Sequence, residues 1–295
     1  MPLFGAHFSI AGGLTNAVRT AVQYKCQTLQ IFTKSAAQWA AKTLTDAEVR
    51  EFRRATSDAG LLQLTAHDSY LINLAAPGDE LFHKSVDAFV IEWERAEQLG
   101  LDHLVMHPGS HVGSGEKKGL QRVIEGLDVA ASHCRGFRCR VLIETTAGQG
   151  TSLGWRFEHL ATILEGVTEP ERYDVCVDTC HLFAAGYAIG TKNEYADTFG
   201  QFDQLIGLNR IAAFHLNDSA KPFQSRVDRH AGIGDGFIGA AAFRTLVNDP
   251  AFQSKPMILE TPKEDAQGRV MDPINLRRIR RLVLKSNPNE FSLPN

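Results

Sequence analysis

The chain has 295 residues, 43% of them hydrophobic, and a formal charge of −3 that comes from 31 Lys and Arg against 34 Asp and Glu. This composition allows a large buried core, and it lacks the net basic charge that would indicate nucleic-acid binding by the whole surface. No stretch reaches the roughly 18 consecutive apolar residues of a membrane span, and the first residues do not resemble a signal peptide. We therefore expect a cytoplasmic protein that does not enter a membrane.

The five cysteines are odd in number and show no CxxC spacing. This pattern disfavours both a disulfide framework and a sulfur-rich zinc site. We expect reduced thiols that are mostly buried.

Short strand-like runs alternate with helical patterns along the chain. Runs at 3–7 and 28–32 enclose a helix near 14–24, and a capping box at 45–48 opens a helix that Gly60 closes. Six more runs follow, with helices near 82–100, 120–132, 157–165, 193–206 and 241–248, and a last helix with Asp272 as its N-cap. Eight strands and eight helices predict one (β/α)8 TIM barrel over residues 1–295, with its active site at the C-terminal strand ends. A doubly wound open sheet is the alternative.

Each of the six later runs ends on a side chain that binds metals well, and two loops add three more such side chains. The nine candidates are His67, His107, Glu144, Asp178, His181, His215, Asp228, His230 and Glu260. One zinc ion takes three or four protein ligands, so nine suit two or three ions with a bridging carboxylate. Nitrogen and oxygen donors favour zinc or manganese. A lone histidine such as His103 is more often structural, and we expect His7 to orient a ligand.

Adjacent zinc ions suit an attack by water on a negatively charged centre. They lower the pKa of water from about 15.7 to about 7 and stabilise both oxygens of a phosphoryl displacement. Phosphodiester hydrolysis is therefore favoured, although sugar isomerisation also uses paired metals on barrels. The sequence has no GxSxG elbow, no P-loop and no GxGxxG motif after a strand. The AGQG segment at 147–150 is interpreted as a tight turn or as a phosphate contact.

Long sequence blocks resemble endonuclease IV, the zinc-dependent apurinic/apyrimidinic (AP) endonuclease family of base excision repair. The blocks are GAHFSIAGGLTNA at 5–17, HDSYLINLA at 67–75, LVMHPGSH at 104–111, IETTAGQG at 143–150, CVDTCHLFAAGY at 176–187, FHLNDS at 214–219 and SRVDRHAGIGDG at 225–236. They keep the family's order over nearly the whole chain.

The resemblance implies three zinc ions, with manganese possible at one site. It assigns His67, His107 and the bridging Glu144 to one ion, Glu144, Asp178, His215 and Glu260 to a second, and His181, Asp228 and His230 to a third. It implies that a hydroxide between the first two ions attacks the phosphate 5′ to an abasic site, with Glu144 and Glu260 as catalytic residues. The 3′-hydroxyl product, the 5′ deoxyribose phosphate and the removal of blocked 3′ ends follow from the same resemblance.

The expected partner is double-stranded DNA with abasic sites or blocked 3′ ends, bound by a monomer. Tyr70 and Leu71 match positions that the family inserts into DNA, and unstacking costs less than usual at an abasic site. The basic side chains expected to contact phosphates from loops near the site are Lys34, Lys221, Arg226 and Arg229.

Two positions depart from the family pattern. Ala37 stands where relatives can place an arginine in the base stack, and Gln224 replaces a glycine common before SRxDRH. We expect an altered grip on DNA with the chemistry retained.

Two other functions are weighed against this one. A metal-dependent sugar isomerase or epimerase would need two metals, so the third ligand set argues against it. A noncatalytic lesion-binding protein would not need the complete set of carboxylates that Glu144 and Glu260 provide.

Overall fold

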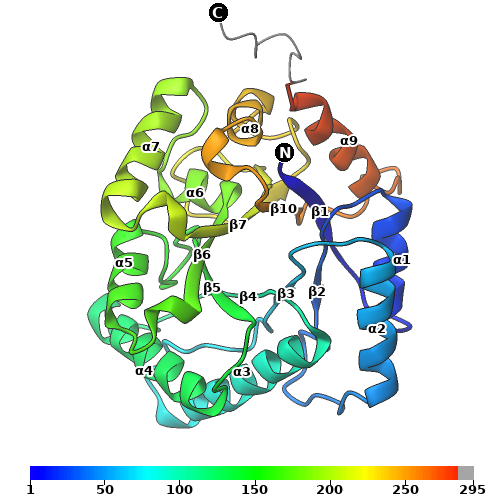
Figure 1. Cartoon of the computed structure of the whole chain (residues 1–295). Coiled ribbons are helices and arrows are strands. Elements are labelled where there is room, and N and C mark those ends of the chain that lie inside the picture. The colour runs from blue at the N-terminus through cyan, green and yellow to red at the C-terminus, as the bar shows by residue number, and fades with distance from the viewer. Residues whose placement is uncertain (285–295) are drawn as a thin grey trace, which may run out of the picture.

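The fold is a closed barrel of eight parallel strands inside a ring of helices (Figure 1). The structure is a computed structural model and describes residues 1–284, so residues 285–295 of the expected domain lie outside the described part. Around the barrel the strands follow in the order β1 (Leu3–Phe8), β10 (Pro256–Leu259), β7 (Ile211–His215), β6 (Tyr173–Asp178), β5 (Arg140–Glu144), β4 (His103–Met106), β3 (Thr65–His67) and β2 (Gln30–Phe32). Because β1 pairs with both β10 and β2, the sheet has no free edge. This confirms the predicted (β/α)8 barrel and excludes the doubly wound open sheet.

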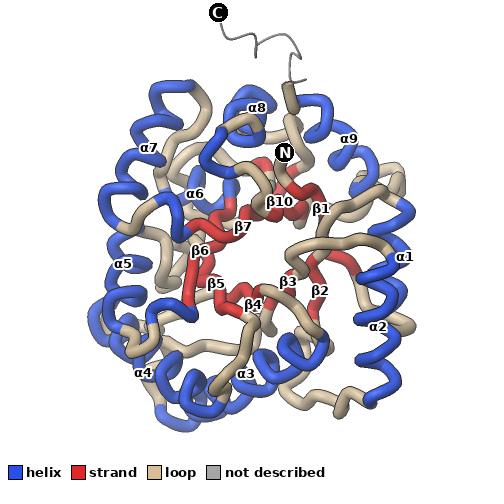
Figure 2. The backbone as a smooth tube through the Cα atoms, in the orientation of Figure 1, coloured by secondary structure: helices blue, strands red, loops and turns tan. Residues whose placement is uncertain are grey.

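The predicted helices are all present and form the outer layer (Figure 2). They are α1 (Leu14–Gln23), α2 (Asp46–Asp58), α3 (Asp79–Leu99), α4 (Glu116–His133), α5 (Phe157–Gly166), α7 (Lys192–Leu205), α8 (Ala240–Val247) and α9 (Asp272–Leu282). The capping box of α2 forms as predicted. The Glu48 carboxylate accepts from the backbone N–H of Thr45 at 2.8 Å, and the backbone N–H of Glu48 donates to the Thr45 hydroxyl. The predicted cap of α9 is wrong by one residue, because Met271 is the N-cap and Asp272 begins the helix.

Several short elements were not predicted. The helix α6 (Thr179–Ala185) follows β6 directly, and two short strands, β8 (Asp218–Ser219) and β9 (His230–Ala231), pair antiparallel in the long loop after β7. Three 3-10 turns, η1 (Pro170–Arg172), η2 (Leu208–Arg210) and η3 (Pro250–Phe252), precede strands. Segments of this length contain too few residues to show a hydrophobic period.

Alternation along the strands decides which side chains point into the barrel. Val105, Leu142, Cys176 and Ala213, with Ala212, form a separate buried cluster. Their strand neighbours Leu104, Val141, Val175 and Phe214 belong to the large core that also contains the helices' apolar residues. Side chains two positions apart on a strand share a face. The residues that follow the inner cluster by two positions are His107, Glu144, Asp178 and His215. The period of two therefore directs these four side chains to the inside of the barrel mouth.

All five cysteines are free, and all but Cys26 are buried, as expected. Among residues 1–284, no helix has the length and apolar character needed to cross a membrane.

Candidate metal centre

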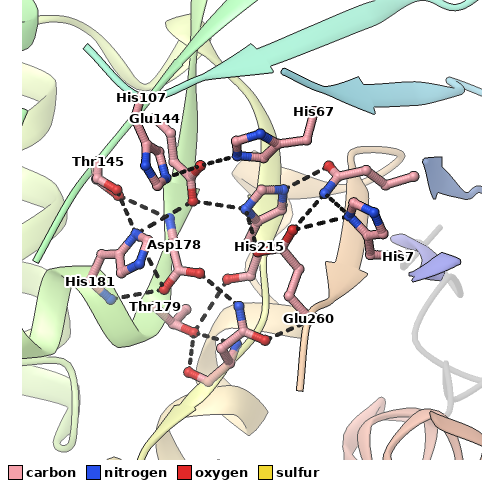
Figure 3. A network of polar contacts seen from close by, with 12 residues as sticks. His7, His67, His107, Glu144, Thr145, Asp178, Thr179, His181, His215 and Glu260 are labelled. Atoms are coloured by element: carbon pink, nitrogen blue, oxygen red, sulfur yellow. Dashed lines mark hydrogen bonds and ion pairs between the residues drawn. The ribbon is translucent and has the colours of Figure 1, made fainter. Parts of the chain in front are cut away.

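The nine predicted donors lie together at the C-terminal mouth of the barrel. Figure 3 shows seven of them, including His67 from β3, Asp178 from β6 and Glu260 directly after β10, pointing toward one another. The groups whose donor atoms all lie within 4.8 Å of one another include His67, His107 and Glu144, a second set of Glu144, Asp178, His215 and Glu260, and a third of Asp178, His181 and His230. The structure thus brings together side chains that are far apart in the sequence.

Glu144 lies between two of these donor sets. Its Oε2 is 3.1 Å from Nε2 of His67 and 2.9 Å from Nε2 of His107. Its Oε1 is 2.8 Å from Nδ1 of His215, and that nitrogen is 3.2 Å from Oε2 of Glu260. The carboxylate is completely buried, and each oxygen faces a different set. This is the arrangement expected of a carboxylate that bridges two cations.

Asp228 joins the third set, in which two ring nitrogens have no hydrogen-bond partner within the described residues. Nδ1 of His181 donates to the Thr145 carbonyl at 2.7 Å, and Nδ1 of His230 donates to the Glu260 carbonyl at 3.1 Å. Because a carbonyl only accepts, Nδ1 of each ring carries a proton, and Nε2 is the nitrogen that a cation would take. Each Nε2 is 3.2 Å from an oxygen of Asp228, yet neither forms a hydrogen bond in that part of the chain. Two such nitrogens on either side of a carboxylate suit a cation.

The site holds strongly paired charges. Burial by itself lowers the pKa of His67, but Asp68 and Glu144 outweigh it and bring the pKa well above its ordinary value. Burial also lowers the pKa of His230, but the carboxylates of Asp178 and Asp228 outweigh it and raise the pKa to about 9. For Glu144, burial raises the pKa, but His215 and His107 hold it well below the usual range. A cation that binds here must replace protons on the imidazoles, so its binding is coupled to pH.

Other side chains that support the donors were not predicted. Asn217 donates to Oδ2 of Asp178 at 2.7 Å and accepts from the backbone N–H of Glu260 at 2.9 Å. Thr145 accepts from the backbone N–H of Asp178 at 2.9 Å. Gln30 bonds to both Glu260 and His215. The signal for Gln30 was present, because a glutamine in the apolar run TLQIF requires a polar partner.

His7 of β1 lies where an orienting residue would lie. Its Nδ1 is 2.9 Å from Nε2 of Gln30 and 3.4 Å from Oε1 of Glu260. Burial is the largest influence on its pKa and lowers it, so the ring is neutral.

A cleft of about 380 Å³ opens above the donors. Its lining includes His107, Gln149, Asp228 and two of the expected DNA contacts, Tyr70 and Arg229. The Tyr70 side chain is 72% exposed, and Leu71 beside it is half-buried. The cleft is therefore bordered by an exposed aromatic ring on a loop that begins at a metal-ligand candidate.

The other four expected DNA contacts, Leu71 and three basic residues, lie outside the cleft lining. Lys221 is exposed, and the exposed Arg226 places its guanidinium 3.9 Å from the ring centre of Trp155. The expectation for Lys34 needs correction. Its ammonium is buried, pairs with Glu92 at 3.2 Å and donates to the Gln38 carbonyl at 2.6 Å. A buried ammonium with these partners does not present its charge to a phosphate.

Two loop predictions acquire a physical basis. Gln224 has φ +60°, a left-handed conformation that explains why a glycine suits this position. In the AGQG segment, a Cβ on Gly148 would lie 2.9 Å from the side chain of Trp155, which supports the tight turn. Gln149 accepts from the backbone N–H of Asp228 at 3.2 Å, so this turn also holds the loop of the third donor set.

Fold and site together define a (β/α)8 barrel with several metal-binding donor sets at its mouth. Residues 18–281 match the family of xylose isomerase-like TIM barrels. A probable endonuclease 4 of Chloroflexus aurantiacus is 50% identical over 283 residues, which cover 96% of this chain and 99% of that protein. The crystal structure of endonuclease IV from Thermus thermophilus has a TM-score of 0.83 at 37% identity, over 95% of this chain and 98% of that one.

The chain therefore belongs to the endonuclease IV family. A putative xylose isomerase from Rhodospirillum rubrum has a TM-score of 0.73 at 15% identity, over 96% of this chain and 98% of that one. At that identity the likeness concerns the fold alone. The resemblance inferred from the sequence blocks is thus confirmed at the level of the family.

Proposed function

We propose that this chain is an AP endonuclease of base excision repair. It cleaves the phosphodiester 5′ to an abasic site in duplex DNA, leaving a 3′-hydroxyl and a 5′ deoxyribose phosphate, and it removes blocking groups from 3′ ends. The observation that carries the proposal is Glu144, whose two oxygens face separate donor sets beside a third set around Asp228. Membership of the endonuclease IV family supports the same activity.

The donor sets fit three zinc ions, with manganese as an alternative at one of them. Glu144 would bridge two ions. It would hold the first together with His67 and His107, and the second together with Asp178, His215 and Glu260. The third ion would be held by His181, Asp228 and His230. Zinc held at these positions would lower the pKa of water and would stabilise the entering and leaving oxygens of a phosphodiester. The donors include no sulfur in these assignments, which suits zinc with nitrogen and oxygen ligands or manganese.

The protein's own groups position the reactants. Glu260 is partly open to solvent, and its Oε1 is fixed by Gln30 at 2.6 Å, so its carboxylate is placed to orient an incoming water. Glu144 is completely buried and keeps its negative charge between the histidines. We assign the catalytic roles to these two carboxylates.

The cleft edge provides the grip on damaged DNA. Tyr70 is exposed beside the donors, and together with Leu71 it forms a wedge that enters the base stack at the lesion. Unstacking normally costs a few kcal/mol, and it costs less where a base is missing. Arg229 in the cleft wall, with the exposed Lys221 and Arg226 of the same loop, supplies phosphate contacts.

The test is cleavage of a duplex that contains one abasic analogue. Zinc-loaded protein should nick the strand 5′ to the analogue, lose this activity after chelation and regain it with zinc. If metal-loaded protein leaves the duplex intact and instead converts a free sugar, the isomerase alternative replaces this proposal.

Glu260→Gln tests the assigned residue directly. The variant should fold and bind DNA but lower turnover by orders of magnitude. Glu264→Gln is the matched control, because Glu264 carries the same carboxylate on the same loop but is exposed and is not part of a donor set. Undiminished cleavage by Glu260→Gln would remove that carboxylate from the reaction.

A further inference from the structure

Gln30 is a buried amide at the centre of the second donor set. It is the first residue of β2, and its side chain has no exposed surface. Its Nε2 donates to Oε1 of Glu260 at 2.6 Å and lies 2.9 Å from Nδ1 of His7. Its Oε1 lies 2.8 Å from Nε2 of His215. One side chain thus contacts two candidate ligands and the histidine behind them.

The neighbours allow only one orientation of this amide. A rotation that exchanged oxygen and nitrogen would place the carbonyl oxygen 2.6 Å from the Glu260 carboxylate, where two acceptors repel. The NH2 group therefore faces Glu260 and His7, and the carbonyl oxygen faces His215. Because this oxygen only accepts, Nε2 of His215 must carry a proton.

The tautomer of His215 has a direct consequence for metal binding. With the proton on Nε2 held by Gln30, Nδ1 is the ring nitrogen that faces the donor set, 2.8 Å from Glu144 and 3.2 Å from Glu260, and it is the nitrogen that a cation would take. At the same time, the bond from Gln30 restrains Oε1 of Glu260, so Oε2 is the oxygen directed at the donor set.

We propose that Gln30 is a positioning residue that prepares the second cation site. It holds a proton on Nε2 of His215, which leaves Nδ1 as the nitrogen for a cation, and it fixes the carboxylate of Glu260. Partners of this kind change metal affinity about 10- to 100-fold. The proposal rests on the metal content given under the proposed function, but it does not depend on DNA cleavage.

Two substitutions separate the two bonds. Gln30→Met keeps the length of the side chain and removes both the donor and the acceptor. Gln30→Glu keeps an acceptor for His215, but it replaces the donor to Glu260 by a second carboxylate. Gln63→Met is the control, because the Gln63 amide bonds to the Ser254 carbonyl at 2.9 Å, away from the donor sets.

The first measurement is zinc affinity, determined by competition with a chromogenic chelator in the absence of DNA. Gln30→Met should bind one zinc ion about 10- to 100-fold more weakly and the other ions as wild type does, and Gln63→Met should bind every ion as wild type does. Equal affinity for every ion in wild type and Gln30→Met would overturn the proposal. Wild-type protein that binds zinc but fails to cut DNA would instead overturn only the proposed function.

The second measurement reports the tautomer itself. In histidine labelled with ¹⁵N, the two-bond proton–nitrogen pattern shows which ring nitrogen of His215 carries the proton. In the zinc-loaded state, wild type and Gln30→Glu should carry it on Nε2, and Gln30→Met should show a mixture of both arrangements. A proton on Nδ1 of His215 in zinc-loaded wild type would contradict the inference, even if Gln30→Met fails to fold.

Discussion

The buried ion pair between Lys34 and Glu92 allows a quantitative test of how the loop after β2 is held. The ammonium and carboxylate are 3.2 Å apart, and their side chains are only 4% and 2% exposed. Glu92 also accepts from the Thr33 hydroxyl, and Lys34 donates to the Gln38 carbonyl. Removing one partner leaves the other charge buried without its counter-ion, which costs about 3 to 5 kcal/mol. We therefore expect Glu92→Leu to lower the free energy of unfolding by this amount.

The double variant Lys34→Met with Glu92→Leu gives the opposite expectation. Replacing both charges by apolar side chains is about neutral for stability, since neither member of the pair is left buried without its counter-ion. Urea unfolding measures both variants. The control is the pair of the exposed Arg269 with the partly buried Asp265, which should cost at most about 1 kcal/mol when Arg269 is replaced by Met. Two results would refute this reasoning. One is a Glu92→Leu variant that loses less than about 1 kcal/mol of unfolding free energy. The other is a double variant that loses as much unfolding free energy as Lys34→Met and Glu92→Leu lose together.

Three further predictions concern stability and the loop of the third donor set. The pKa of His103 is lowered to about 4 by burial and by Arg140 and Lys255. Between pH 6.5 and 4, His103 therefore binds a proton in the unfolded chain but not in the folded protein. The free energy of unfolding should fall by about 3 kcal/mol as the pH drops through this window. In urea unfolding, His103→Gln should remove this dependence, and an unchanged pH profile would contradict it. Gln224→Gly relieves the left-handed conformation and should raise the free energy of unfolding by about 0.5 to 1 kcal/mol, whereas a lower melting temperature would be inconsistent with strain at this position. The carboxylate of Asp218 accepts from the backbone N–H groups of Ser219, Gly234, Gly236, Ile238 and Gly239. Asp218→Asn should cost about 2 to 4 kcal/mol and expose the loop that carries His230 to proteolysis, and a loop as resistant as in wild type would show that these bonds do not hold it.

The sequence by itself was sufficient to predict the barrel and to select its donors. Short apolar runs between helical patterns identified the strands, and a metal-binding side chain at the end of six of them is a poor choice for a buried position unless something uses its lone pairs. Parallel strands in a closed barrel end at the same mouth, so naming the last residue of each strand also predicted that Glu144, Asp178 and His215 would meet.

Only the tertiary structure decided which other polar side chains serve the site. Gln30 and Glu260 are 230 positions apart, and nothing local to either residue shows that they form a hydrogen bond. Lys34 and Arg229 were both expected to contact phosphates from loops near the site, yet one is buried against Glu92 and the other lines the cleft. Pattern and propensity describe how a residue relates to its chain neighbours. The partner of a buried amide or ammonium is set by packing between separate strands and helices, and that is known only once the barrel has closed.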